Sequence, residues 1–399
     1  MIKRVFVTLL LVALILSSQG CAAGALIRDV EIRPATISPN ADGSDDIAEI
    51  KYTLTDQSQV TIYFVDSAGN KHVFRDDKRR SAGPRTTYFS GIIDGSLLPD
   101  GTYTVVIEAV SARKTESIQR ELVITNGDPV HIEIQNLSVF PREFTPNRDG
   151  ITDRVTISYS LNKEASRVEV YLLDEEGIKY PVAEDKIRAF GAAGAHEHDY
   201  DAGIDLGATP PADGTYTLVV EAEDAVGNKA RVEDSITITG GGVPRVEIAN
   251  GAAQFSSTTV PLGGTLTFTC TVRNIGTVPV RTKGPASGYV YTTSENYNTL
   301  EQYEEPGIFR IGLDFEGNSA GRSYTFRWQL GSDEELTTVQ TDIGPQKYLM
   351  PGQTVTVVGH LKIDDAPPKA APYYWIGLIQ EQVQMVQDRV EATPITIGF

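Results

Sequence analysis

Apolar and polar residues alternate with a period of two along most of this chain. The alternation is clear at residues 49–54, 154–161 and 265–272, and it is typical of strands with one face toward a core. Turn residues separate these short segments at the spacing of antiparallel sandwiches, and no convincing long amphipathic helix interrupts them. The pattern therefore predicts an all-β chain of antiparallel, immunoglobulin-like β-sandwiches.

The C-terminal region gives two competing patterns. Ile379, Val383, Val386 and Val390 are spaced as on one face of a helix, whereas the apolar segment 373–379 is typical of a strand. A β-rich context usually overrides a short helical coincidence. We therefore expect strands joined in a hairpin.

Three similar segments mark the beginnings of three predicted domains. Each places apolar residues on both sides of a glutamate, as in Val30-Glu31-Ile32, Ile132-Glu133-Ile134 and Val246-Glu247-Ile248. Turn-rich breaks at 126–129 and 240–244 precede the second and third segments. The expected domains are residues 27–126, 130–240 and 244–399, the last being a larger sandwich with a long insertion near 281–306.

The first two domains are copies of one repeat. Both contain Pro-Asn-x-Asp-Gly-x-x-Asp, at Asn40–Asp46 and Asn147–Asp153, and both continue into an alternating strand. Both later contain Asp-Gly-Thr-Tyr-Thr, beginning at Asp100 and at Asp213. Two shared motifs in the same order indicate a common fold for the two segments.

These motifs resemble the immunoglobulin-like module at the C-terminus of the flagellar hook-scaffolding protein FlgD. The resemblance covers roughly residues 27–240 and implies a scaffold or surface module, without implying flagella. The family often has Trp-Asp-Gly before the last hairpin, where this chain has Phe89-Ser90-Gly91 and Tyr200-Asp201-Ala202. The segment 263–276 resembles the opening of bacterial adhesion-type immunoglobulin-like domains.

The N-terminus has the pattern of an export signal. Lys3 and Arg4 precede a short apolar run, and small residues lead to Cys21. We expect a signal peptide at residues 1–20 and a short tether at 21–26. The cysteine resembles the lipidated residue of bacterial lipoproteins, although the usual leucine three residues earlier is replaced by Ser18. This interpretation predicts a lipid anchor at Cys21 in the cell envelope, and the alternative is cleavage near Ala25 with secretion.

Charge and composition narrow the class of partner. The formal net charge is −18, which argues against a nucleic-acid-binding protein because no basic face is available for the phosphates. Cys270 is the only cysteine besides Cys21 and lies in an alternating strand, where a buried thiol is the usual outcome. We therefore expect hydrophobic cores to hold the domains together.

The repeated loop is the first candidate site. Calcium prefers several oxygen ligands, and alternating polar residues before a glycine supply them in known calcium loops. The candidate ligands are the loop's polar side chains, Asn40, Asp42, Asp46, Asn147, Asp149 and Asp153. The alternative is a structural turn in which these side chains hydrogen-bond to the local backbone. The sequence lacks the bidentate glutamate of an EF-hand, which favours the turn.

Two further groups of residues suggest binding. His196 and His198 share one face of a predicted strand, but without a third ligand we expect a solvated loop. The third domain is rich in aromatic residues, namely Tyr289, Tyr291, Tyr297, Tyr303, Tyr324, Trp328, Tyr373, Tyr374 and Trp375. Tyr289, Tyr291, Tyr297 and Tyr303 lie in a turn-rich segment, so they are the candidate binding face. The alternative is that they form core.

No familiar catalytic pattern is present. The sequence lacks a nucleophile elbow, a zinc-protease motif and a phosphate-binding loop. We therefore expect a non-enzymatic surface protein, with an immunoglobulin-like stalk presenting a C-terminal domain for adhesion or scaffolding. Its partner would be an unidentified protein or glycan. The alternative is a carbohydrate-binding or accessory module of an extracellular degrading system.

Overall fold

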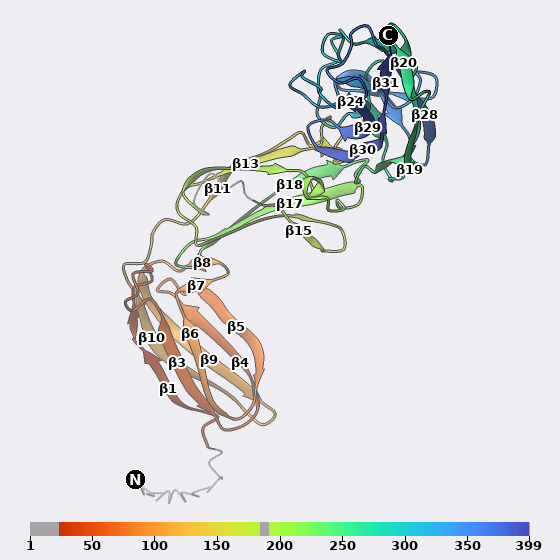
Figure 1. The fold of residues 1–399 in the computed structure, drawn as a ribbon. Coiled ribbons are helices and arrows are strands. Elements are labelled where there is room, and N and C mark those ends of the chain that lie inside the picture. The colour runs from red at the N-terminus through yellow and green to blue at the C-terminus, as the bar shows by residue number, and fades with distance from the viewer. Residues whose placement is uncertain (1–23, 184–190, 399) are drawn as a thin grey trace, which may run out of the picture. The chain divides into compact units, whose positions relative to one another are not determined.

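The computed structural model describes residues 24–183 and 191–398. These residues form antiparallel-dominated β-sheets, and their only helical element is the 3-10 turn η1 (Ile204–Leu206). The chain is thus all-β, as predicted (Figure 1). The signal-peptide prediction and Cys21 lie outside the described residues. Within the described part, no helix has the length and apolar character needed to cross a membrane.

The first sandwich packs a three-stranded sheet against a five-stranded sheet. The three-stranded sheet has the order β1 (Ile27–Arg33), β3 (Ala48–Leu54), β6 (Gly83–Phe89). The five-stranded sheet has the order β2 (Thr36–Ile37), β10 (Thr115–Ile124), β9 (Gly101–Ser111), β4 (Ser58–Val65), β5 (Lys71–Arg80). The short pair β7 (Ile92–Ile93) and β8 (Ser96–Leu97) completes it.

The second sandwich repeats this topology. Its three-stranded sheet has the order β11 (Ile134–Phe140), β13 (Val155–Leu161), β16 (Gly194–Tyr200). Its five-stranded sheet has the order β12 (Glu143–Phe144), β18 (Lys229–Ile238), β17 (Gly214–Glu223), β14 (Arg167–Leu173), β15 (Lys179–Pro181). The matching strand order confirms the repeat that the sequence predicts.

The Asp-Gly-Thr-Tyr motif has the same structural task in both copies. The Tyr103 hydroxyl donates to the Pro99 carbonyl at 2.7 Å, and the Tyr216 hydroxyl donates to the Ala212 carbonyl at 2.7 Å. Such a tyrosine bonded to backbone a few residues upstream is a hallmark of immunoglobulin-like sandwiches. The Asp100 and Asp213 carboxylates each accept two backbone N–H groups just beyond the final strand. The motif therefore connects the start of one strand to the backbone just after the final strand at the same end of each sandwich.

The third sandwich is larger. One sheet has the order β19 (Val246–Phe255), β21 (Thr265–Asn274), β28 (Thr354–Lys362), β23 (Val290–Thr292). The other has the order β26 (Thr337–Thr341), β27 (Gly344–Leu349), β22 (Val280–Thr282), β24 (Phe309–Phe315), β29 (Tyr373–Gln380), β30 (Gln384–Pro394), with β25 (Phe326–Trp328) paired to β24. The parallel pair β20 (Thr259–Pro261) and β31 (Thr396–Gly398) lies beside them in the topology.

The C-terminal region forms the predicted hairpin. β29 and β30 pair antiparallel from Tyr373 with Pro394 to Gln380 with Gln384. Ile376 and Leu378 are buried on β29, while Val383 at the turn is exposed. The helical spacing of the valines is therefore a coincidence, because strand pairing decides which of them reach the core.

Each sandwich has its own hydrophobic core, within residues 26–124, 132–238 and 246–397. In the third core the fully buried Trp328 ring lies 5.1 Å from Phe268 and 4.9 Å from Tyr291, each edge to face. Cys270 is also buried there, and burial raises the pKa of its thiol to about 12. A thiol in this state is a small apolar core group, as expected.

The described residues divide into two compact units. The first runs to His131 and also includes Asp224–Lys229, and the second includes Ile132–Glu223 and continues from Ala230. The second and third sandwiches thus share one unit, and the loop Asn147–Asp153 is their joint. A Cβ added to Gly307 of the third sandwich would lie 2.4 Å from the Arg148 carbonyl oxygen, so the two backbones touch there.

We predict that Gly307→Ala loosens this joint. Gly307 has φ +80°. The control position Gly352 has a similar φ of +76°, but a Cβ added there would meet no atom within 4 Å. Gly352→Ala should lower the free energy of unfolding by about 1–2 kcal/mol through backbone conformation alone. Gly307→Ala should lower it by about 3 kcal/mol or more, because the overlap with Arg148 adds to that cost. Urea unfolding of the two variants measures the difference, and equal losses would contradict the close approach.

Candidate functional site

The two Asn-x-Asp-Gly loops share one network of hydrogen bonds. In the first loop the Asp46 carboxylate accepts the N–H groups of Asn40, Ala41 and Gly43 at 2.8–3.1 Å. In the second loop the Asp153 carboxylate accepts the N–H groups of Asn147, Asp149 and Gly150 at 2.6–3.3 Å. The Asn40, Asp42, Asn147 and Asp149 side chains each accept the N–H two residues further on. The motif residues are therefore the ones that close the turn.

The surroundings of the two loops differ. Asn40 and Asp42 are exposed, whereas Asn147 and Asp149 are each 6% exposed. The Asp149 carboxylate accepts a 2.7 Å hydrogen bond from the hydroxyl of Tyr348 in the third sandwich. The Gln380 side-chain amide donates to the Arg148 carbonyl at 3.1 Å. The second loop thus serves as a docking element between two sandwiches.

Burial also changes the ionisation of the second loop. It raises the pKa of Asp149, and together with the charge of Asp149 it raises the pKa of Asp153 to about 6. The raised pKa values mean that holding both carboxylates in their charged form costs free energy, and a bound cation would offset that cost. No group of three or more His, Cys, Asp or Glu side chains in the described ranges is arranged as a metal site. The hydrogen bonds match the turn interpretation, and calcium stays a prediction.

The two histidines are not in a solvated loop, and that expectation is wrong. His196 and His198 are 3% and 2% exposed on β16. Both rings stack on Tyr159, with centroids 5.1 Å and 5.6 Å away. His196 hydrogen-bonds to the Ala192 carbonyl and His198 to the Ala183 carbonyl. Strand pairing with β13 turns this face inward, so the histidines are core residues of the second sandwich.

The four candidate tyrosines do not form one exposed face, which corrects the predicted binding platform. Tyr291 and Tyr297 are 0% and 1% exposed, Tyr289 is partly buried, and Tyr303 is 60% exposed. The Tyr291 hydroxyl donates to the Arg327 carbonyl at 2.8 Å. The rings of Tyr291 and Tyr297 are thus core, and of the four tyrosines only Tyr303 is displayed to solvent.

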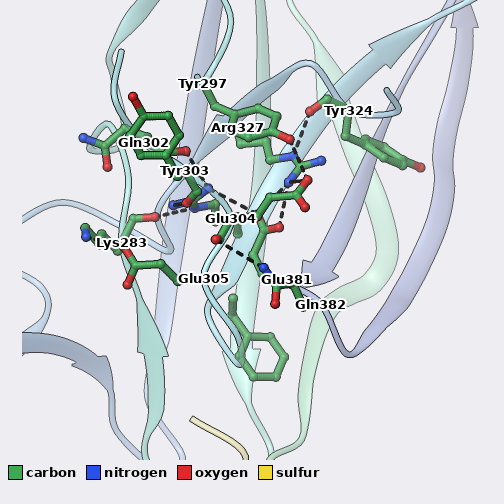
Figure 2. Close-up of polar contacts among 12 residues, drawn as sticks. Lys283, Tyr297, Gln302, Tyr303, Glu304, Glu305, Tyr324, Arg327, Glu381 and Gln382 are labelled. Atoms are coloured by element: carbon green, nitrogen blue, oxygen red, sulfur yellow. Dashed lines mark hydrogen bonds and ion pairs between the residues drawn. The ribbon is translucent and has the colours of Figure 1, made fainter. Parts of the chain in front are cut away.

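A buried arginine fixes the irregular segment that carries Tyr303. Arg310 on β24 is fully buried, and its Nε donates to the Lys283 carbonyl at 2.6 Å. Its Nη atoms donate to the carbonyls of Gln302 and Tyr303 at 3.2 Å and 3.1 Å. Figure 2 shows Lys283, Gln302 and Tyr303, the three residues whose carbonyls accept these hydrogen bonds. One side chain of the sheet therefore holds three backbone carbonyls of the insertion.

A second arginine joins the insertion to the β29–β30 turn. The Arg327 Nη1 donates to both Glu381 oxygens at 2.8 Å and 2.7 Å, and to Glu304 Oε1 at 3.0 Å (Figure 2). Its guanidinium lies 4.0 Å from the centroid of the Tyr297 ring, within cation–π range. The Tyr297 hydroxyl donates to Glu304 at 2.6 Å. We call Tyr297, Glu304, Arg310, Arg327 and Glu381 the charged cluster.

The charged cluster has a structural chemistry. Burial raises the pKa of Glu381 and lowers that of Arg310, and in each case the opposite charge counters the effect. The Tyr297 hydroxyl and then Arg327 hold the pKa of Glu304 below its usual value. Each charged group is committed to another or to a backbone carbonyl, and the cluster contains no nucleophile. Its arrangement fixes a loop and supplies no acid–base pair for catalysis.

Beside the charged cluster lies an open pocket of about 590 Å³, which the sequence alone does not reveal. Its lining includes Arg322, Tyr373, Trp375 and Arg389. The signal in the sequence is weak, since Tyr373 and Trp375 are only two of the many aromatic residues in this domain. Only strand pairing shows that they share one face of β29 and meet the turn after β24.

The calcium hypothesis makes a direct prediction. Ligation would raise the thermal midpoint with added Ca²⁺ relative to chelator, because a ligand of the folded state stabilises by about 2.7 kcal/mol at one hundred times its Kd. Scanning calorimetry of the intact chain measures this shift. Asp153→Asn and Asp46→Asn would assign it to the second or first loop. Identical midpoints with calcium and with chelator would count against ligation.

We also predict that Glu381→Gln is strongly destabilising. It leaves Arg310 and Arg327 buried without their shared carboxylate, which should cost about 3 kcal/mol of unfolding free energy. The control Asp364→Asn removes the exposed pair with Lys362 and should cost less than about 1 kcal/mol. Urea unfolding compares the two, and equal effects would show that the cluster does not hold the loop.

Comparison with known proteins identifies no family for this chain. No protein-family model and no curated protein matches it. A solved tetra-tandem repeat from the extending region of a large adhesion protein is 15% identical, with 88% of this chain and 81% of that chain covered and a TM-score of 0.20. The ICAM-5 D1–D4 ectodomain fragment is 14% identical, covering 82% and 75%, with a TM-score of 0.20.

The three N-terminal domains of the bacteriophage RB49 outer capsid protein Hoc are 11% identical, covering 92% of this chain and 97% of that chain, with a TM-score of 0.22. TM-scores of this size carry no functional argument. The conclusion that this chain is a tandem array of immunoglobulin-like sandwiches therefore rests on its own sheets, cores and tyrosine hydrogen bonds.

Proposed function

We propose that this chain is a non-enzymatic protein of the bacterial cell envelope or surface. Its first two sandwiches are stalk repeats of the FlgD type, and its third sandwich is a recognition domain for adhesion or scaffolding. The partner is a protein or a glycan of the cell exterior. Lipid on Cys21 anchors the N-terminal end to the membrane.

The charged cluster is the observation that carries this proposal. A buried ion pair rarely adds net stability compared with apolar packing, but in some proteins it selects one conformation of the groups it joins. Here Arg310 and Arg327 fix the segment 283–305, and the exposed Tyr303 ring is displayed on it. A rigid loop with an exposed aromatic side chain binds a partner with little loss of conformational entropy.

In the parts of the two repeats that the structure describes, residues 24–183 and 191–240, no comparable cluster of buried ion pairs is present. Within each of the first two sandwiches, tight turns closed by an aspartate join neighbouring strands, as at Asp66 in the first and Asp174 in the second. The large ordered insertion and the charged cluster occur in the third sandwich. This division supports a spacer role for the repeats and a recognition role for the third domain.

The first test is location. In cells that make the protein, external protease should remove the third sandwich without lysis, and the mature N-terminal peptide should carry lipid mass on Cys21. Protection of the whole chain until the cells are broken would overturn a surface role. An unmodified mature N-terminus near Leu26 would overturn the anchor.

The second test is recognition. Beads coated with the full mature chain should adhere to intact cells, and Tyr303→Ala should weaken adhesion about tenfold if this ring is an anchor. The matched control is Tyr88→Ala, because Tyr88 is 63% exposed on the first sandwich and Tyr303 is 60% exposed. Both variants should fold, since neither ring is buried. Equal adhesion of the two variants would contradict recognition through the insertion.

A further inference from the structure

The open pocket of the third sandwich is formed by three segments. The end of β24 and the turn that follows it, residues 314–323, make one wall, and the strands β29 and β30 contribute Tyr373, Trp375 and Arg389. Its volume of about 590 Å³ lies within the usual range of small-ligand sites. The three segments are far apart in sequence, so only the fold assembles this surface.

The wall after β24 is held rigidly by one buried carboxylate. Asp314 is 7% exposed and accepts hydrogen bonds from Phe315 N at 2.9 Å, Asn318 Nδ2 at 2.7 Å and Tyr324 N at 3.1 Å. The same Asn318 amide donates to the Arg322 carbonyl at 2.9 Å. The turn is therefore tied at both ends, and the pocket exists before any ligand arrives.

Tyr324 sets the position of Arg389 on the opposite wall. Its ring packs over Gly312 and Gly377, a cross-strand pair where an added Cβ would lie 2.6 Å from Tyr324 atoms. Its hydroxyl accepts a 3.0 Å hydrogen bond from Arg389 N and donates to the Asp388 carboxylate. The glycines of the two strands thus leave the space that the Tyr324 side chain occupies, and the Tyr324 hydroxyl holds the pocket wall in place.

The backbone at this wall is in an unusual conformation. Tyr324 has φ 56° and Arg389 has φ 48°, in the left-handed region that bulky residues rarely adopt. Such conformations cost free energy and persist where the surrounding structure imposes them, often at ligand sites. In this arrangement the Arg389 guanidinium lies 4.9 Å from the Trp375 ring centroid.

The lining combines aromatic rings with charged groups. Tyr373 is 48% exposed, Trp375 is partly buried, and Phe315 stacks on Tyr374 beneath them at 5.3 Å. Arg322 and Arg389 are exposed at the pocket, where Arg322 Nη1 also donates to the Tyr297 hydroxyl at 3.4 Å, and Glu316 is paired with Lys369. The pocket therefore offers apolar ring faces beside two guanidinium groups, on a chain whose net charge is −18.

We propose that this pocket binds an acidic saccharide. A sugar ring has an apolar face of C–H groups that packs on aromatic side chains, and hydroxyls that need polar neighbours. A sugar carboxylate is the planar acceptor that arginine recognises best. In this assignment Tyr373 and Trp375 meet the ring, while Arg322 and Arg389 meet the carboxylate. The inference rests on the proposed role of the third sandwich in recognition and names its ligand class.

Other ligand classes fit the pocket less well. The mostly polar lining gives an apolar small molecule little surface to bury. A nucleic acid would need a basic face to replace its counterions, and the two arginines stand on a strongly acidic molecule. A single carboxylated sugar needs only the local charge that the pocket provides.

Tryptophan fluorescence gives a direct test on the intact mature chain. The chain has two tryptophans, and Trp328 is fully buried with its indole N–H bonded to the Tyr289 carbonyl, so Trp375 is the reporter. Titration with oligogalacturonate should change the emission, and the neutral galacto-oligosaccharide of equal length should bind at least about tenfold more weakly. Binding of the acidic probe should also weaken as salt is raised.

Two variants locate the site. Arg389→Asn should weaken oligogalacturonate binding at least about tenfold, and asparagine tolerates the left-handed backbone there. Arg273→Asn is the matched control, because Arg273 is an exposed arginine of β21 that does not line the pocket. Trp375→Phe should remove the fluorescence signal, so calorimetry should follow binding in that variant.

The outcomes separate the two proposals. No binding of either sugar, equal binding of both sugars, or equal loss in the Arg389 and Arg273 variants would each overturn the acidic-saccharide assignment. Bead adhesion that depends on Tyr303 would survive any of these results, since Tyr303 does not line the pocket. Adhesion lost with Tyr303→Ala together with intact sugar binding would support both sites independently.

Discussion

The third sandwich depends on one buried arrangement of charge, in which Arg310 and Arg327 share Glu381. Removing these groups from water is costly, and it is offset only because nearly every donor has a partner in the insertion or the adjoining turns. The result is a long irregular segment held in one conformation. Arg310 positions Tyr303 on that segment by donating hydrogen bonds to the carbonyls of Gln302 and Tyr303. Arg327 positions the wall of the neighbouring pocket by donating to the carbonyls of Ser323 and Tyr324.

The repeated Asn-x-Asp-Gly loop shows how one local structure serves two environments. Its aspartates close the same turn in both copies, so the motif is explained by backbone hydrogen bonds alone. In the second copy the outer side of the loop is buried against the third sandwich through Tyr348 and the close approach of Gly307. Shared sequence therefore encodes the turn, while the neighbouring domain decides whether it also becomes a joint.

The pocket has a similar origin in long-range packing. Tyr324 occupies space that Gly312 and Gly377 leave open, and its hydroxyl then fixes the backbone of Arg389. None of these residues is close to the others in sequence, and each is an ordinary strand or turn residue when considered alone. The aromatic and arginine side chains of the pocket come together only when three strands of one sheet are aligned.

The sequence by itself determined the all-β class, the two copies of a repeat and most strand positions, because period-two alternation and turn residues act over a few neighbours. It also identified the turn chemistry of Asn147–Asp153. It misplaced His196 and His198 in solvent and Tyr291 and Tyr297 on a surface, because periodicity does not say which face of a strand is covered. Only the tertiary structure decided that, together with the pairing of buried charges and the pocket at Trp375, since these depend on contacts between residues distant in the chain.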